Sequence, residues 1–236
     1  MKKFLIALII IVLLVPTVAL ATKNLSDIEE HWGKEYINSL VDRGIVDGYT
    51  DGTFKPDNTI GRDAFIKLTV VALGYKVGNA EGYWAQNYID KAIELNLIAS
   101  DEFDDYTKPI KREEMASIVV KAIVKEEFEA DSNLLDYILH DINDYGNITD
   151  KYKHSVLSSY AFGVITGYDG YFRPQGTATR AEASTILTRY LEEDIRQPYE
   201  ADSSIPTVEL ENVLDRSQTI TAVSYTHLTL PTILLV

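Results

Sequence analysis

The chain has 236 residues, of which 46% are hydrophobic and 25% are charged, as in a globular protein of one or two domains. It has no cysteine, which excludes disulfides, thiolate metal sites and thiol nucleophiles. The net charge of −14 argues against nucleic acid and anionic membranes as partners, because basic patches supply the affinity for both. An anionic ligand would therefore need a local site.

The first 21 residues have the pattern of an export signal. Two lysines precede the apolar run Phe4–Val15, and Ala19–Ala21 has the small residues of a cleavage site. A retained membrane anchor is the alternative, but the apolar run is short and Pro16 follows it. We predict that residues 1–21 are a signal peptide, that the mature protein is secreted and that it has no membrane segment after cleavage.

The next segment predicts two helices joined by a glycine loop. Apolar residues recur at helical spacing over 36–41 and over 64–72, and each run ends near a glycine. Between them, residues 48–62 read GYTDGTFKPDNTIGR, in which glycines allow a turn while Phe54 and a proline hold the loop in place. Arg62 is expected to begin the second helix without a strong cap, because a glycine precedes it.

A similar string recurs late in the chain, where residues 167–182 read GYDGYFRPQGTATRAE. The phenylalanine and the arginine are equally far apart in both strings. Thr179 and Glu182 form a capping box, which predicts a helix that begins at Arg180. The arginine would then lie beside free amides at the positive end of the helix dipole, an arrangement that suits an anion.

A third, more divergent string lies between these two. Its first helix follows Tyr83 and Trp84, and its second helix is expected to begin at Arg112. In place of the loop glycines the chain has the acidic run ASDEFDD at residues 99–105, so a ligand site that uses this loop is predicted to be weakened. Each helix–loop–helix unit is too small to bury its own apolar faces, so we expect the three to fold together.

These ordered strings resemble the S-layer homology (SLH) family, in three tandem copies. The family's repeat runs from F-x-D and a tryptophan through a helix to G-I-I-x-G-Y-x-D-G-T-F-x-P and I-T-R-A-E-F. The resemblance places the repeats at 22–78, 79–128 and 129–195. It implies an all-α fold with a pseudo-threefold arrangement, in which a central three-helix bundle carries helix–loop–helix prongs separated by grooves.

The resemblance also implies a function and a set of ligand-binding residues. The family anchors exported proteins non-covalently to the Gram-positive cell wall, by binding a secondary cell-wall polysaccharide whose terminal sugar often carries a pyruvyl ketal. An arginine would bind the ketal carboxylate, glycines would let the backbone approach, aromatic rings would stack on sugars, and aspartates at the F-x-D position would accept from hydroxyls. The predicted residues are Arg62, Arg112, Arg180, Asp27, Trp32, Trp84, Gly48, Tyr49, Gly167, Tyr168 and Asp141.

These residues also allow other interpretations. A single arginine at a helix start is most often exposed or paired with an acid, here Asp63, Glu114 or Glu182, and a tryptophan beside an amphipathic helix is mostly core. Recurrence at equivalent positions favours a ligand site. Neither glycine loop fits an EF-hand, the four histidines are unclustered, and no catalytic motif is present, so we predict no cofactor, no metal and no enzymatic activity within this chain.

The helical pattern stops after Leu191. Residues 196–221 are predicted to be a linker and the start of a further region. The run VSYTHLTLPT that follows resembles the translation of a sequencing-library adapter, so residues 222–236 are predicted to be a non-native tail. If the natural protein continues, two alternatives arise: the targeting part of a truncated wall-associated hydrolase, or a structural S-layer subunit.

Overall fold

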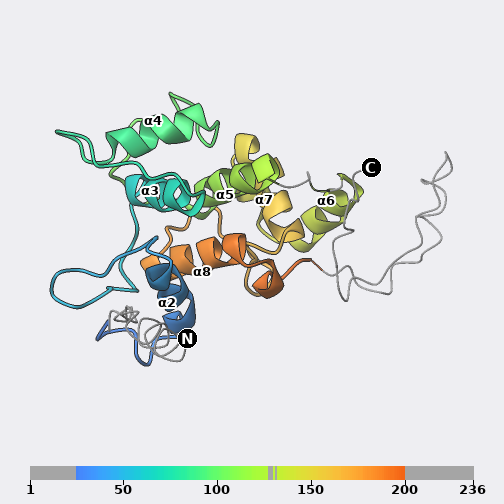
Figure 1. Ribbon diagram of the computed structural model, residues 1–236. Coiled ribbons are helices and arrows are strands. Elements are labelled where there is room, and N and C mark those ends of the chain that lie inside the picture. Colours follow the sequence, from blue (N-terminus) through green and yellow to red (C-terminus); the bar gives the residue numbers. More distant parts are fainter. Residues whose placement is uncertain (1–24, 127–129, 131, 200–236) are drawn as a thin grey trace, which may run out of the picture. The chain divides into compact units, whose positions relative to one another are not determined.

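The computed structural model describes residues 25–126, 130 and 132–199, which form helices joined by loops (Figure 1). The predicted signal peptide, residues 200–221 and the predicted tail lie outside this part. The α-helices are α2 (Lys34–Asp42), α3 (Arg62–Ala72), α4 (Gln86–Glu94), α5 (Arg112–Glu126), α6 (Ser132–Ile138), α7 (Lys153–Ala161) and α8 (Arg180–Leu191). Short 3-10 helices lie at Leu139–Asp141, Tyr145–Asn147, Asp150–Tyr152 and Glu193–Ile195. These residues contain isolated β-bridges but no strand, so the all-α prediction is confirmed for them.

The helix starts follow the predicted capping chemistry. Before α8, the Thr179 hydroxyl accepts from the Glu182 amide at 3.2 Å, and the Glu182 carboxylate accepts from the Thr179 amide at 2.8 Å. Before α5 only half of this box exists, since the Glu114 carboxylate accepts from the Lys111 amide at 3.0 Å. Gly61 precedes α3 and provides no side-chain cap. The three helices therefore begin at the predicted arginines with caps of decreasing completeness.

Six of these helices form three consecutive segments, which contain α2 and α3, α4 and α5, and α7 and α8. The second helices α3, α5 and α8 each contact the other two. Each first helix packs on the second helix of a different segment: α4 on α3, α7 on α5, and α2 on α8 (Figure 1). No segment therefore buries its apolar face alone. Buried side chains from all six helices share one core, including Ile37, Phe65, Ile89, Ile118, Val156 and Leu187.

The residues just before α3, α5 and α8 hydrogen-bond to one another in a closed ring. The Ile60 amide donates to the Ala178 carbonyl at 3.1 Å, the Ala178 amide to the Ile110 carbonyl at 3.2 Å, and the Ile110 amide to the Ile60 carbonyl at 2.9 Å. Beside the ring, the first amide of each helix donates to a loop of another segment: Arg62 to Lys108, Arg112 to Gly176 and Arg180 to Asn58. Each helix start is thus fixed by a different segment.

An aspartate holds each of the two glycine loops. Both carboxylate oxygens of Asp27 accept from loop amides, those of Phe54 and Lys55, at 2.7 Å. Asp144 makes the same pair of bonds in the third segment, at 2.8 and 2.7 Å. Asp144 is therefore the structural counterpart of Asp27, and the prediction that Asp141 holds this position is wrong.

The chain after α8 folds back onto the third segment. The Gln197 amide donates to the Gly163 carbonyl at 3.0 Å, and the Tyr199 amide donates to the Tyr160 carbonyl at 3.2 Å. The Tyr199 hydroxyl also donates to the Asp141 carboxylate. Residues 196–199, predicted as the start of a linker, are thus packed against the helical unit.

Candidate functional site

The three helix-start arginines occupy corresponding places in the fold. Each guanidinium extends over a phenylalanine from the loop of another segment: Arg62 over Phe103 at 4.6 Å, Arg112 over Phe172 at 5.3 Å, and Arg180 over Phe54 at 4.4 Å. Each also donates to a carbonyl of that loop. All three arginines therefore help to hold a neighbouring loop. They differ in the acid that faces them.

Arg62 is fully paired within the protein. Its Nη2 donates to Glu114 Oε1 at 2.6 Å, its Nε donates to Glu114 Oε2 at 2.9 Å, and its Nη1 donates to the Asp105 carbonyl at 2.9 Å. The hydrogen bond that Arg62 donates to Glu114 raises the pKa of Arg62. The nearer acid, Asp63, instead accepts from the Tyr83 hydroxyl at 2.9 Å. Arg62 is therefore paired with an acid, as the alternative interpretation of a single arginine predicts.

Arg112 is loosely paired. Its Nε donates to the Phe172 carbonyl at 2.8 Å and its Nη2 to the Thr166 carbonyl at 3.2 Å. The Glu182 carboxylate lies 3.8 Å from Nη1, but it is also bound in the capping box of α8. Burial lowers the pKa of Arg112, and the charge of Glu182 opposes this shift. The guanidinium is therefore only partly neutralised.

Arg180 forms no ion pair with any described carboxylate. Its Nε donates to the Phe54 carbonyl at 2.8 Å, its Nη2 lies 3.5 Å from the Asp47 carbonyl, and its guanidinium lies 5.1 Å from the centre of the Tyr49 ring. Burial lowers the pKa of Arg180, because removing water disfavours the charged form, and the charges of Tyr49 and Asp27 oppose this shift. A half-buried cation that contacts carbonyls and aromatic rings but forms no ion pair favours an incoming anion.

The difference between the arginines follows from one helix position. At the third residue of α5 and of α8, Glu114 and Glu182 each face an arginine of another segment. At the third residue of α3 the chain has Ala64, which lines the same groove as Arg180. The sequence departs from the family's T-R-A-E string at this place. As a result, the Arg180 groove lacks the glutamate that faces the arginine at the other two positions.

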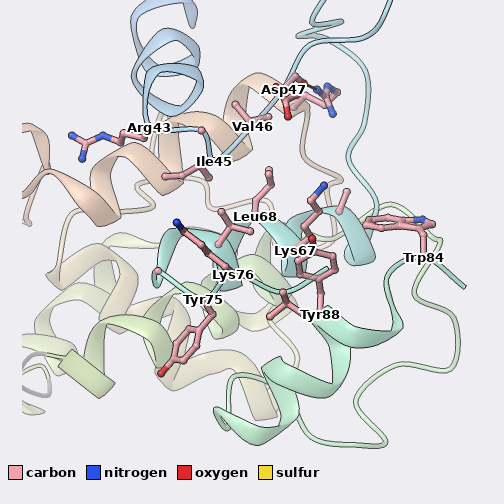
Figure 2. Close-up of a pocket in the computed structure, with 16 residues that line it drawn as sticks. Arg43, Ile45, Val46, Asp47, Lys67, Leu68, Tyr75, Lys76, Trp84 and Tyr88 are labelled. Atoms are coloured by element: carbon pink, nitrogen blue, oxygen red, sulfur yellow. Dashed lines mark hydrogen bonds between the residues drawn. The ribbon is translucent and has the colours of Figure 1, made fainter. Parts of the chain in front are cut away.

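The groove around Arg180 has a volume of about 630 Å³, within the usual range of about 300–1,000 Å³ for ligand pockets. The chain just after α2, one side of α3 with the chain that follows it, and the residues around the start of α4 form its walls (Figure 2). Its charged side chains are mostly basic: Arg43, Lys67, Lys76 and Arg180, against Asp47. Trp84 and Tyr88, with ring centres 6.3 Å apart, provide an aromatic wall.

A cavity of about 90 Å³ lies at the corresponding place beside Arg112. Trp32 lines it where Trp84 lines the larger groove, and Glu182 lines it where the larger groove has Ala64. Trp32 is 60% exposed, so it is not a core residue and its ring is accessible. This cavity resembles the larger groove in its arginine and tryptophan but is smaller and contains an acid.

The predicted helix-start amides are already bonded within the protein. The Arg180 amide donates to the Asn58 carbonyl at 2.8 Å, and the next amide along α8 donates to the Pro56 carbonyl at 3.0 Å. The Glu182 amide is bonded to the cap of its own helix. The groove therefore offers an anion guanidinium and ammonium groups, and the expectation of free amides there is wrong.

The loop glycines and aspartates have roles inside the protein. A Cβ at Gly48 would lie 2.2 Å from Leu25, and one at Gly167 would lie 2.2 Å from the Tyr160 hydroxyl, so these positions need glycine for packing. Asp27 holds its loop through both oxygens, and Asp141 binds Tyr199. Contact of these four predicted residues with a ligand stays a prediction.

The remaining predicted aromatic residues are accessible. Tyr49 is 42% exposed and lies beside Arg180, while Tyr168 is 75% exposed at the tip of the third-segment loop. Asp169 and Gly170, with φ of 55° and 76°, form the two-residue turn next to Tyr168. The structure thus brings Tyr49 close to Arg180 and places Trp84 in the same groove.

Sequence reasoning missed most of the residues that line this groove, among them Ala64, Lys67 and Lys76. The signal for Ala64 was present, since GRDA stands where the family has T-R-A-E. The two lysines carry no motif, and they become notable only because the fold places them beside an arginine from another segment. In the described residues no helix is long and apolar enough to span a bilayer, and no group of His, Asp and Glu could hold a metal ion.

Comparison with known proteins identifies the family. The S-layer homology domain matches residues 24–66 and 141–184. Exoglucanase XynX of Acetivibrio thermocellus is 32% identical over 71% of this chain and 16% of its own length. The S-layer protein of Bacillus licheniformis is 26% identical over 82% of the chain and 22% of its own length. The cellulosome-anchoring protein of Acetivibrio thermocellus is 30% identical over 43% of the chain and 25% of its own length.

The chain therefore spans a quarter or less of these three relatives. The matched domain is a binding and anchoring module rather than a catalytic one. The matches fall on the first and third segments, which carry the two glycine loops. The chain is an S-layer homology domain protein.

Proposed function

We propose that this chain anchors an exported protein to the Gram-positive cell wall by binding an anionic secondary cell-wall polysaccharide. Domains of this family are anchoring modules, and its relatives include a cellulosome-anchoring protein and S-layer proteins of the cell surface. One observation carries the proposal. Arg180 is a half-buried cation that forms no ion pair with a described residue, in a groove whose charged side chains are mostly basic although the chain is acidic.

The ligand group that fits Arg180 best is a carboxylate, such as that of a pyruvyl ketal on a terminal sugar. A guanidinium can donate two parallel hydrogen bonds to a carboxylate, and partial burial strengthens them. Trp84 and Tyr49 offer ring faces to the sugar. The Arg112 cavity is the second choice, because Glu182 competes there. The Arg62 position does not bind, because Glu114 occupies the guanidinium.

The three segments are proposed to be three repeats, at 22–78, 79–128 and 129–195, around a pseudo-threefold axis. The closed ring of hydrogen bonds between Ile60, Ala178 and Ile110 supports this arrangement, because each residue has the same place in its segment. The mutual contacts of α3, α5 and α8 support a central three-helix bundle. The first helices would then form the prongs between which the grooves lie.

The test is co-sedimentation of the chain with purified Gram-positive cell walls, intact or chemically stripped of secondary polymer. We expect binding to intact walls only. Arg180→Gln should weaken it at least about tenfold, since a charge-assisted contact is worth about 1.5–3 kcal/mol. Lys108→Gln, which removes one exposed charge outside the groove, is the matched control and should bind like the wild type. Equal binding to stripped walls would contradict the proposal.

Two further proposals concern the role of the whole protein. The exoglucanase relative matches over only 16% of its length, so such a chain could be the targeting part of a wall-associated hydrolase. The S-layer relative favours a structural subunit instead. Sequencing of the gene beyond the codon for residue 221 would distinguish them, because a hydrolase motif there would indicate an enzyme.

A further inference from the structure

We propose that the Arg180 groove has a second anionic subsite at Lys67, so that its ligand is a polymer segment with two negative groups. The inference rests on the proposed function, because it assumes that Arg180 takes the first carboxylate. It adds that a single ketal-bearing sugar would leave part of the groove unmatched, and that the neighbouring sugar carries a further anion such as a carboxylate or a phosphate.

Lys67 is held in place without being neutralised. It extends from α3 with its ammonium 5.7 Å from the centre of the Trp84 ring and 5.6 Å from that of Tyr88. Figure 2 shows its nitrogen directed away from the α3 ribbon, between these rings and Asp47. It is half-buried and forms no ion pair with a described residue. Aromatic faces position a cation while leaving its charge available.

The charge balance of the groove calls for more than one anion. Arg43 is already paired, with its Nη2 2.7 Å from Glu192. Arg180, Lys67 and Lys76 remain, with Asp47 as the opposing acid, which leaves a net charge of +2. One ketal carboxylate would neutralise half of this. The volume of about 630 Å³ is also large enough for more than a terminal residue.

The second subsite is specific to this groove. The residue of α8 that corresponds to Lys67 of α3 is Thr185, which lines the Arg112 cavity. The ammonium therefore has no counterpart at that position. The second cation that lines that cavity is Arg189, further along α8, and Glu182 offsets one of the two positive charges there. The two sites should consequently differ in ligand preference, with the larger one selecting the more highly charged polymer segment.

The test compares two probes: purified cell walls, and a methyl hexoside carrying one pyruvyl ketal. We expect Lys67→Gln to weaken wall binding about tenfold while changing the dissociation constant of the ketal sugar less than about twofold. Lys67→Arg should restore wall binding, because it keeps the charge. Lys108→Gln should leave both unchanged. The dependence of wall binding on salt should also decrease in Lys67→Gln, since one ion contact is lost.

Each other outcome is informative. If Lys67→Gln weakens both probes equally, Lys67 contacts the ketal itself and the second subsite is wrong. If it weakens neither, Lys67 has no part in binding and the inference is wrong as well. If the wild type binds neither intact walls nor the ketal sugar, the proposed function fails, which is a distinct result. Circular dichroism of each variant separates these outcomes from loss of folding.

Discussion

At the scale of single residues, the acid opposite an arginine decides how that arginine is used. Glu114 makes a two-bond pair with Arg62, and both side chains are nearly buried, with 5% and 13% exposed. Separating such a pair would leave two desolvated charges, so a ligand cannot easily compete with it. Ala64 leaves Arg180 without this competitor. Three equivalent arginines are therefore not three equivalent sites.

Restoring the missing acid should close the Arg180 groove to anions. In Ala64→Glu we expect the new carboxylate to pair with Arg180 as Glu114 pairs with Arg62, and wall binding to weaken at least about tenfold. Ala64→Gln is the matched control, because it adds similar bulk without charge. The dissociation constants of both variants for purified walls would be measured side by side. Equal weakening in both would show that bulk, not charge, matters at this position.

Alkaline pH should expose a different residue-scale effect. Burial raises the pKa of the Tyr160 hydroxyl to about 12, whereas an unfolded tyrosine has a pKa of about 10. Between these values the unfolded chain loses the proton and the folded chain keeps it. The stability that Tyr160 contributes is therefore complete below pH 10 and declines as the pH rises towards 12.

The melting temperature should accordingly fall between pH 10 and pH 12. Tyr160→Phe removes the titrating group, so the fall should be smaller in this variant. Tyr83 and Tyr152 also have raised pKa values, from burial first and then from hydrogen bonds to Asp63 and Glu102, so a residual fall remains. If the melting temperatures of the wild type and of Tyr160→Phe fall equally with pH, the fall does not come from Tyr160.

The sequence predicts some of these residues and not others. The arginines stand out because the same string recurs around them. The position that corresponds to Asp27 was assigned to Asp141 instead of Asp144, because the two aspartates lie only three residues apart. The apolar residue two positions earlier is the better signal for this position, since Ile142 precedes Asp144 as Leu25 precedes Asp27, and both are buried. Lys67 was missed because its partners come from other segments.

At the scale of elements, local capping chemistry determines where the inner helices begin. Thr179→Ala should destabilise the protein by about 1 kcal/mol, because it removes the oxygen that caps α8. Lys111→Ala, at the same position before α5, should cost less than about 0.5 kcal/mol, since the cap there is the carboxylate of Glu114. Urea unfolding would give both free energies. Similar losses would mean that the side chain before the helix does not matter.

The residues at which the inner helices begin can be predicted because nearby capping residues determine them. The same dependence makes these helix starts sensitive to mutation. The capping box before Arg180 and the glycine before Arg62 act within one helical turn, so a short string contains the necessary information. The bonds that complete these starts are not local. The first amides of α3, α5 and α8 donate to loops of other segments, which no periodicity in the sequence reveals.

At the scale of the whole molecule, the three segments depend on one another. Each first helix packs on the second helix of another segment, and the ring through Ile60, Ala178 and Ile110 closes the arrangement. The resemblance to a known family supplied this architecture as an expectation. The small size of each unit predicts that the three fold together, but composition and periodicity do not specify which helix packs on which.

The interleaving makes a sharp prediction about unfolding. The chain has two tryptophans, Trp32 in the first segment and Trp84 in the second. Trp84→Phe and Trp32→Phe therefore each leave one fluorescent reporter. Because α2 packs on α8 and α4 packs on α3, neither segment can unfold without exposing core from another. In each variant, we expect the urea midpoint measured by the fluorescence of the remaining tryptophan to equal the midpoint measured by circular dichroism of the helices. Two separated midpoints within one variant would mean that the segments fold independently and that the hydrogen-bonded ring contributes little to cooperativity.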